Sequence, residues 1–232
     1  MILESRQIIH MGINYHILPI PPIDQPNNIR FQQHLLRSGI VATSSTVQGN
    51  RISISRKPQP LEIALIGQGT QPPVGQILIL APNPNRPLSL FISEVEAILK
   101  AFNEAWPAPN RQILLCDVAL RWLYQSTSDH AFQEIWEKRL HQSRELLHKL
   151  GRPVHGGGLR FVMPPQQDDP ESAQIELKIE SFLQDTKKIF IEIQSIWRQP
   201  KPLGSDFTPA DRLNRANEYV EKQVHAFMEG ES

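Results

Sequence analysis

The sequence predicts an α+β protein made of two similar halves, residues 1–110 and 111–232, with mainly antiparallel sheets. Residues 174–180 and 189–197 alternate polar and apolar side chains, which is the period of half-buried strands. Residues 209–227 carry apolar side chains at helical spacing. The same order, two paired strands followed by a helix, recurs before residue 110. Each half therefore follows the order β-α-β-β-β-α. Its nearest common relative is the ferredoxin-like split βαβ layout, and a pseudo-twofold is expected to relate the halves, with their sheets either fused or packed.

The C-terminal unit shows these signals most clearly. Between its two alternating runs, residues 183–187 form a predicted turn. Thr208, Pro209 and Asp211 are typical of a helix start, because a hydroxyl caps free N–H groups and proline fits the first helical position. The predicted apolar stripe of this helix comprises Leu213, Ala216, Val220, Val224 and Phe227.

The first half begins with a predicted strand at residues 12–18. A helix capped by Asn27 or Asn28 and closed by Gly39 follows it. A second helix, at residues 88–106, has one continuous apolar side and ends this half. Between the two helices, strands are expected at 41–47, 51–56, 61–66 and 77–80.

The second half opens with a strand at residues 111–124 that is mostly apolar on both faces. Such a strand is expected to be central and covered on both sides. Asp129 is predicted to cap a long helix that ends at Leu150, just before a glycine. A further strand is expected at residues 159–163.

Composition and charge exclude several classes of protein. The chain of 232 residues is 40% hydrophobic and 21% charged, which is typical of a globular domain rather than a disordered one. Lys plus Arg and Asp plus Glu number 24 each, so the basic excess of many nucleic-acid-binding proteins is missing. The single cysteine excludes an internal disulfide and a cysteine-rich zinc site. No run approaches the roughly 20 apolar residues that span a bilayer, so we expect a soluble, cytoplasmic protein without a membrane partner.

Two charged residues interrupt the apolar strand at 111–124. Asp117 and Arg121 lie on one face of it, about 13 Å apart at strand rise, so they cannot pair with each other. Each needs another partner if it is buried. Such interruptions indicate either a structural ion pair or a functional site.

A glycine run supplies the second candidate site. Gly156, Gly157 and Gly158 precede a predicted strand, with Arg152 and Arg160 nearby. Glycines at such a place allow a bulge or a close backbone approach, or they leave N–H groups free to bind an anion. No esterase elbow, phosphate-binding loop or dinucleotide fingerprint accompanies them. We expect any ligand or partner site to lie near the junction of the halves and to use Arg121, Arg160 or this glycine run.

The cysteine and the histidines favour structural roles. Cys116 lies among apolar residues and is expected to be a buried, unreactive core residue. His130, His141 and His148 would share the solvent-facing side of the long predicted helix. The first two would lie about 16 Å apart along its axis, too far to share a metal ion. No catalytic residue, metal or cofactor is predicted.

Three short motifs carry a resemblance. Residues 120–124 read Leu-Arg-Trp-Leu-Tyr, residues 189–193 read Ile-Phe-Ile-Glu-Ile, and residues 224–227 read Val-His-Ala-Phe. Together with the order of elements, they resemble landmarks of a sporadically distributed family of uncharacterised bacterial proteins. No activity is assigned to that family, so the resemblance implies a fold and adds nothing to mechanism.

Three functional hypotheses follow. The lack of a complete catalytic constellation favours a non-catalytic binding or assembly module that acts through protein–protein contacts, with another protein or with itself. A first alternative is an RNA-binding subunit of a nucleoprotein complex, in which sheet aromatics stack on bases. A second alternative is a small-molecule sensor or enzyme that uses Asp117, Arg121 and Arg160 in a pocket between the halves.

Overall fold

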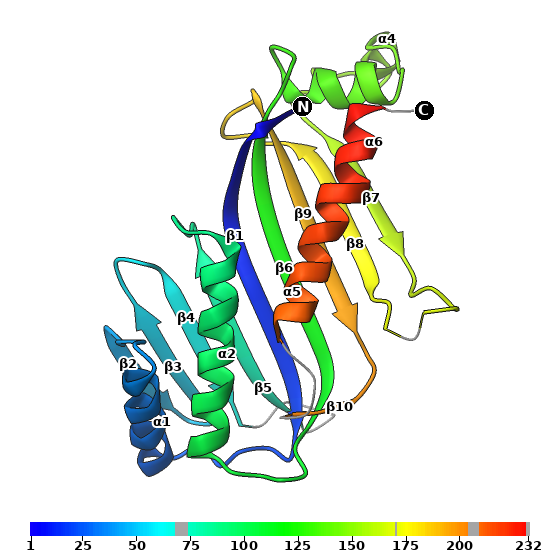
Figure 1. Cartoon of the computed structure of the whole chain (residues 1–232). Helices are drawn as coiled ribbons and strands as arrows, with labels where there is room; N and C mark the ends of the chain where they lie inside the picture. The colour runs from blue at the N-terminus through cyan, green and yellow to red at the C-terminus, as the bar shows by residue number, and fades with distance from the viewer. Residues whose placement is uncertain (68–73, 170, 204–208, 231–232) are drawn as a thin grey trace.

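The computed structural model describes residues 1–67, 74–169, 171–203 and 209–230. Within these ranges the chain is an α+β protein, with an antiparallel sheet of ten strands and a few helices. Figure 1 shows the helices α1 (Gln25–Arg37), α2 (Leu88–Ala105) and α5 (Pro209–Tyr219) together on one side of this sheet. The α+β class and the antiparallel pairing are therefore confirmed.

The two longest strands, β1 (Ile2–Leu18) and β6 (Gln112–Gln125), pair along the middle of the sheet. Outward from β1 lie β5 (Gly75–Pro82), β4 (Leu61–Ile66), β3 (Arg51–Arg56) and β2 (Ser44–Gln48). Outward from β6 lie β9 (Lys188–Trp197), β8 (Gln174–Ser181) and β7 (Gly158–Met163), and the short β10 (Lys201–Pro202) pairs with the start of β6. Strands from residues 1–110 and from residues 111–232 thus share one sheet.

One face of the sheet is buried under the helices, and the other face is only partly buried. Ile13 of β1 lies opposite Val118 of β6, and both are buried against the helices. The next pair, Asn14 and Asp117, points the other way and is only half-buried. The prediction that β6 is covered on both faces is therefore wrong for the middle of the strand, because the helices pack against one side of the sheet. We call the other side the open face.

The core lies between the sheet and the helices. Side chains of α2 and of the C-terminal helix pack on the alternate residues of β1, β5, β6 and β9 that point toward them. Fully buried large members include Tyr15, Phe91, Phe102, Trp122 and Tyr124. None of the helices in the described ranges combines the length and the apolar character needed to cross a bilayer.

The long helix predicted from Asp129 to Leu150 is broken into three pieces. A single turn, α3 (Ala131–Gln133), is capped by His130 and continues into a π-helix, η1 (Glu134–Arg139). His141 has a positive φ of 52° and ends the helical run, and α4 (Glu145–His148) is one further turn. The residues from 141 to 150 are almost all exposed, so no buried face stabilises a continuous helix there. The predicted alignment of His130, His141 and His148 on one helix face is accordingly wrong.

Smaller corrections concern the ends of helices and strands. Asp24 caps α1 by accepting a hydrogen bond from the Asn27 N–H, so neither Asn27 nor Asn28 is the cap. Gly39 closes that helix with a φ of 81°, as predicted. Strand β1 begins at Ile2, ten residues before the predicted start. The predicted cap Thr208 lies outside the described residues.

The C-terminal helix changes phase part of the way along. After α5 the chain forms a π-helix, η2 (Val220–Val224), and then α6 (His225–Glu229). A π-turn inserts one extra residue, which shifts every later side chain around the axis. Met228 is consequently buried at the position predicted for Phe227, and Phe227 is 44% exposed.

This phase shift predicts that alanine substitutions at two neighbouring residues lower the free energy of unfolding by different amounts. Met228→Ala should lower the free energy of unfolding by about 2–5 kcal/mol, because it leaves a cavity under the sheet-facing side of α6. Phe227→Ala should lower it by about 1 kcal/mol or less, since the ring is half-exposed. Urea unfolding of both variants at one protein concentration measures the difference. A larger loss for Phe227→Ala would show that the helix continues without the π-turn.

Candidate functional site

The open face carries a row of paired charges across four strands. The sheet register places Arg121 of β6 beside Glu192 of β9, then Lys178 of β8 and Arg160 of β7. The Glu192 carboxylate accepts hydrogen bonds from Arg121 and from Lys178, the latter at 2.5 Å. Arg160 donates to Glu176 at 2.9 Å. Two of the three predicted arginines, Arg121 and Arg160, are thus engaged in cross-strand ion pairs.

Asp117 has a separate partner. Its two carboxylate oxygens accept from Nε2 of Gln194, at 3.2 and 3.1 Å, on the neighbouring strand β9. Burial raises the pKa of Asp117 above its ordinary value, although the Gln194 hydrogen bond and the nearby His16 and Arg198 oppose the rise. Asp117 and Arg121 therefore have different partners, as their spacing along the strand requires.

The glycine run lies where β7 begins. The Gly157 N–H donates to Ser181 Oγ at 3.0 Å, so it already has a partner within the chain. A side chain on Gly158 would place its Cβ only 2.1 Å from the Ile179 carbonyl oxygen. One on Gly156 would come within 2.6 Å of Ser181 Oγ. These glycines allow the close backbone approach that the sequence suggested as one of two roles.

Arg152 lies apart from the other predicted site residues. It lines a cavity of about 580 Å³ under the broken helical segment, with histidines and a second arginine. The predicted site is therefore divided among three places: the open face with Asp117, Arg121 and Arg160, the start of β7 with the glycine run, and this cavity.

Strand β7 forms an exposed edge of the sheet. Its Phe161 is 37% exposed and its Val162 is 59% exposed, on opposite faces of the strand. Phe161 meets Phe227 of α6 edge to face, with ring centroids 5.8 Å apart. Next to it, the Tyr219 hydroxyl contacts Met163 Sδ at 3.1 Å. We call this surface the β7 surface, and it consists of Leu159, Phe161, Val162, Met163, Tyr219 and Phe227.

A groove of about 370 Å³ continues the β7 surface toward α5. Apolar atoms supply most of its walls, and a few polar groups line it as well. Its lining residues include Met163, Ile175, Ser195, Trp197, Arg215 and Tyr219. Apolar grooves with a few polar groups are the usual places where side chains of a partner or a ligand are held.

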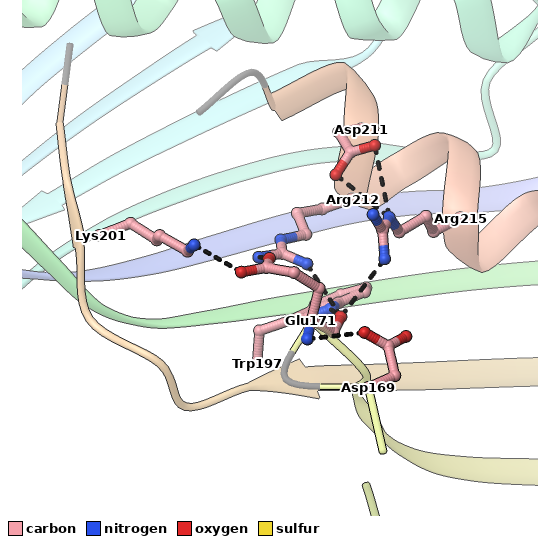
Figure 2. A network of polar contacts seen from close by, with 7 residues as sticks. All are labelled: Asp169, Glu171, Trp197, Lys201, Asp211, Arg212 and Arg215. Atoms are coloured by element: carbon pink, nitrogen blue, oxygen red, sulfur yellow. Dashed lines mark hydrogen bonds and ion pairs between the residues drawn. The ribbon is translucent and has the colours of Figure 1, made fainter. Parts of the chain in front are cut away.

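A polar network fixes the loop that closes this groove. Figure 2 shows Glu171 of the β7–β8 loop between Lys201 and Arg212. The Glu171 carboxylate accepts from both, and its backbone carbonyl accepts from Trp197 Nε1 at 3.0 Å and from Arg215. The buried Arg212 guanidinium lies 4.8 Å from the centroid of the Trp197 ring. The network ties α5, β9 and β10 to the loop between β7 and β8.

The described residues contain no group of three metal-ligating side chains close enough to hold an ion. Cys116 is buried, as predicted, and burial raises the pKa of its thiol. The Tyr124 hydroxyl contacts Nε2 of His225 at 2.9 Å. Burial raises the pKa of Tyr124 to about 12, and it lowers the pKa of His225.

Sequence reasoning missed the β7 surface and the Glu171 network. One signal for the former was available: residues 159–163 read Leu-Arg-Phe-Val-Met, with apolar residues on both faces, and no helix follows to cover the second face. For the network no local signal exists, because Glu171, Lys201 and Arg212 meet only after the chain has folded.

The ion-pair row predicts a pH-dependent contribution of Glu192 to stability. Burial opposes its ionisation, but the hydrogen bonds from Lys178 and Arg121 outweigh it and hold the pKa of Glu192 below the ordinary value. A depressed carboxyl pKa stabilises the fold above the unfolded value, near 4.3, and this contribution is lost as the pH falls. Glu192→Gln should therefore cost about 1–3 kcal/mol at pH 7 in urea unfolding, and the difference from the parent should shrink by pH 3.5.

The matched control for this prediction is Glu218→Gln. Glu218 pairs with Lys222 at 3.0 Å on the exposed side of the C-terminal helix, so its loss should cost about 0.5 kcal/mol or less. A deficit in Glu192→Gln that stays the same from pH 7 to pH 3.5 would contradict the ionised pair.

No protein-family model matches this chain, and no curated protein sequence matches it. The geometry of the chain itself must then indicate the function, and the β7 surface combines exposed apolar side chains with an adjoining groove.

Proposed function

We propose that the protein is a non-catalytic assembly module that associates with a second copy of itself through the edge of strand β7. The observation that carries this proposal is an exposed edge strand with large apolar side chains on both faces, Phe161 and Val162. Edge strands of monomers are ordinarily protected by charge, proline, bulges or a covering element. Strand β7 has one charged side chain, Arg160, and that charge is already paired with Glu176.

The opposite edge of the sheet provides the contrast. Strand β2 exposes Ser44, Thr46 and Gln48, and none of its exposed side chains is large and apolar. A polar edge of this kind remains hydrated in a monomer. The two edges of one sheet therefore differ in the way expected if β7 receives a partner strand and β2 does not.

The surface beside β7 supports addition of a strand. A strand paired with β7 extends the main-chain hydrogen bonds of the sheet, and its alternate side chains face the same way as Phe161. Phe227 and the groove beside Tyr219 lie on that side and offer apolar contacts to those side chains. Strand pairing and apolar burial thus occur together at one place.

Self-complementarity favours a second copy as the occupant. When two β7 strands pair antiparallel about a twofold axis, one residue lies opposite its own copy, because opposite residues share a face. For a strand of six residues, the two registers with the greatest overlap place Arg160 or Phe161 at that position. The first register brings two arginines together, which is unfavourable. The second places Phe161 on Phe161, Leu159 on Met163 and Arg160 on Val162. We infer that the dimer uses the second register.

We also infer that residues 1–110 and 111–232 are copies of one ferredoxin-like unit. Support comes from the strand order, in which β5, β4 and β3 follow outward from β1 as β9, β8 and β7 follow outward from β6. Each series begins with the first strand of its half. The first half has one additional strand, β2, beyond the repeated pattern.

The open face gives less support to the RNA-binding alternative. Arg121, Lys178 and Arg160 are paired with carboxylates there, so their charges are partly neutralised before any phosphate could approach.

Substituting the exposed edge should dissociate the dimer without unfolding the chain. Size-exclusion chromatography with light scattering is expected to give the parent protein a mass twice that of one chain. Val162→Lys should give the monomer mass, because the new lysine lies opposite the Arg160 side chain of the other copy. Its far-UV circular dichroism should be unchanged, since Val162 is exposed. Thr46→Lys, the same change on edge strand β2, should remain dimeric. A parent protein that is monomeric at about 100 µM contradicts the proposal, as does dissociation of both variants.

Disulfide trapping tests the register. Opposite residues of an antiparallel pair have Cα atoms about 4.5–5.5 Å apart, within the range that a disulfide spans. Phe161→Cys should therefore form a covalent dimer on mild oxidation. Val162→Cys should not, because the two copies of residue 162 are diagonal neighbours, about 7–8 Å apart. The buried Cys116 should not compete. Efficient cross-linking through residue 162 and none through residue 161 would overturn this register.

A further inference from the structure

We propose that the cavity beneath the broken helical segment binds a small diphosphate group, either free or carried by a nucleotide. This cavity of about 580 Å³ lies within the 300–1,000 Å³ range of small-molecule sites. It is separate from the β7 surface and does not depend on the proposed dimer. Its lining residues are His130, Phe132, Arg144, Leu147, His148, Gly151, Arg152, Pro153, Val154 and His155.

The lining is one-sided in charge. It includes two arginines and three histidines, and no aspartate or glutamate is among the lining residues. The chain as a whole has zero formal net charge, so this concentration of basic groups is local rather than part of a generally basic surface. A compact, concave set of donors of this kind fits a small anion better than an extended nucleic-acid backbone.

Most of these donors have no competing partner. Within the described ranges of the chain, the side chains of Arg152, His148 and His155 make no hydrogen bond or ion pair. Arg144 pairs with Glu137 through Nε, and its two terminal nitrogens remain as donors. On the open face the guanidiniums of both Arg121 and Arg160 are held by carboxylates, whereas in the cavity only that of Arg144 is.

His130 is oriented by the backbone. Its Nδ1 accepts a hydrogen bond from the Phe132 N–H at 3.1 Å, so the ring proton lies on Nε2. Because the residue lines the cavity, Nε2–H is a fixed donor at its edge. The imidazole that caps the first helical turn thus also contributes to the site.

The glycines shape this cavity. Gly151 has a φ of 70°, which turns the chain after α4 and brings Arg152 to the cavity. A Cβ on Gly157 would lie 3.0 Å from the Phe132 ring, so the absence of a side chain lets the loop close against that ring. The glycine run therefore supports the site through its close packing rather than through free N–H groups.

The test is calorimetric titration of the full chain with inorganic pyrophosphate, ADP and adenosine, in a phosphate-free buffer at low salt. Pyrophosphate and ADP should both bind, and adenosine should not. Arg152→Gln should weaken both by about tenfold or more, the scale of one lost charge-assisted hydrogen bond. Arg152 is exposed and makes no described contact, so this variant should keep the parent melting temperature.

The control is Arg37→Gln, which removes the same charge from the exposed end of α1. It should leave the affinity within about twofold. Tighter binding of ADP than of pyrophosphate would identify a nucleotide-borne diphosphate as the ligand. Equal binding of the two would identify the free anion. Either result supports the site. The proposal is overturned if pyrophosphate does not bind at 10 mM, if adenosine binds as well as ADP, or if Arg37→Gln weakens binding as much as Arg152→Gln.

Discussion

The direct pairing of β1 with β6 is the constraint on which the rest of the structure depends. It joins two groups of strands into one sheet and sets their register, with Ile13 opposite Val118 and Tyr15 opposite Cys116. Since side chains alternate along a strand, this register decides for every outer strand which residues meet the helices. A shift of β6 by one residue against β1 would put Asp117 on the buried face beside Ile13 and turn Val118 to the open face beside Asn14. The apolar pattern of both strands therefore specifies the pairing strongly.

The same register makes the sheet one-sided. With α2 and the C-terminal helix packed on the buried side, the charged residues of β6, β7, β8 and β9 gather on the open face. They neutralise one another there: Glu192 bonds to Arg121 and Lys178, and Arg160 bonds to Glu176. The open face is therefore internally balanced, and unsatisfied surface occurs elsewhere, on the apolar edge of β7 and in the basic cavity near Arg152.

The loop between β7 and β8 links the core to that apolar edge. Glu171 bonds to Lys201 and Arg212, and Arg212 stacks on Trp197, so the loop is held by residues from three later segments (Figure 2). A buried guanidinium such as that of Arg212 is stable only when it has a partner. The network keeps the hairpin of β7 and β8 in place while leaving the outer side of β7 without a partner strand in the described part of the chain. A fixed, exposed edge is a suitable geometry for assembly, because little ordering is needed on binding.

The sequence by itself determined the α+β class, the hairpin of β8 and β9 and the helix α2, because local periodicity encodes each of them. It also indicated that Asp117 and Arg121 need separate partners, since that follows from strand rise alone. Tertiary structure decided what depends on neighbours. Residues 141–150 have a helical pattern but no surface to bury against, so the predicted helix breaks after Arg139. The π-turn at Val220–Val224 exchanged Phe227 for Met228 in the core. The partners of Arg121, Arg160 and Glu171 lie 71, 16 and up to 44 residues away along the chain, and only folding brings them together.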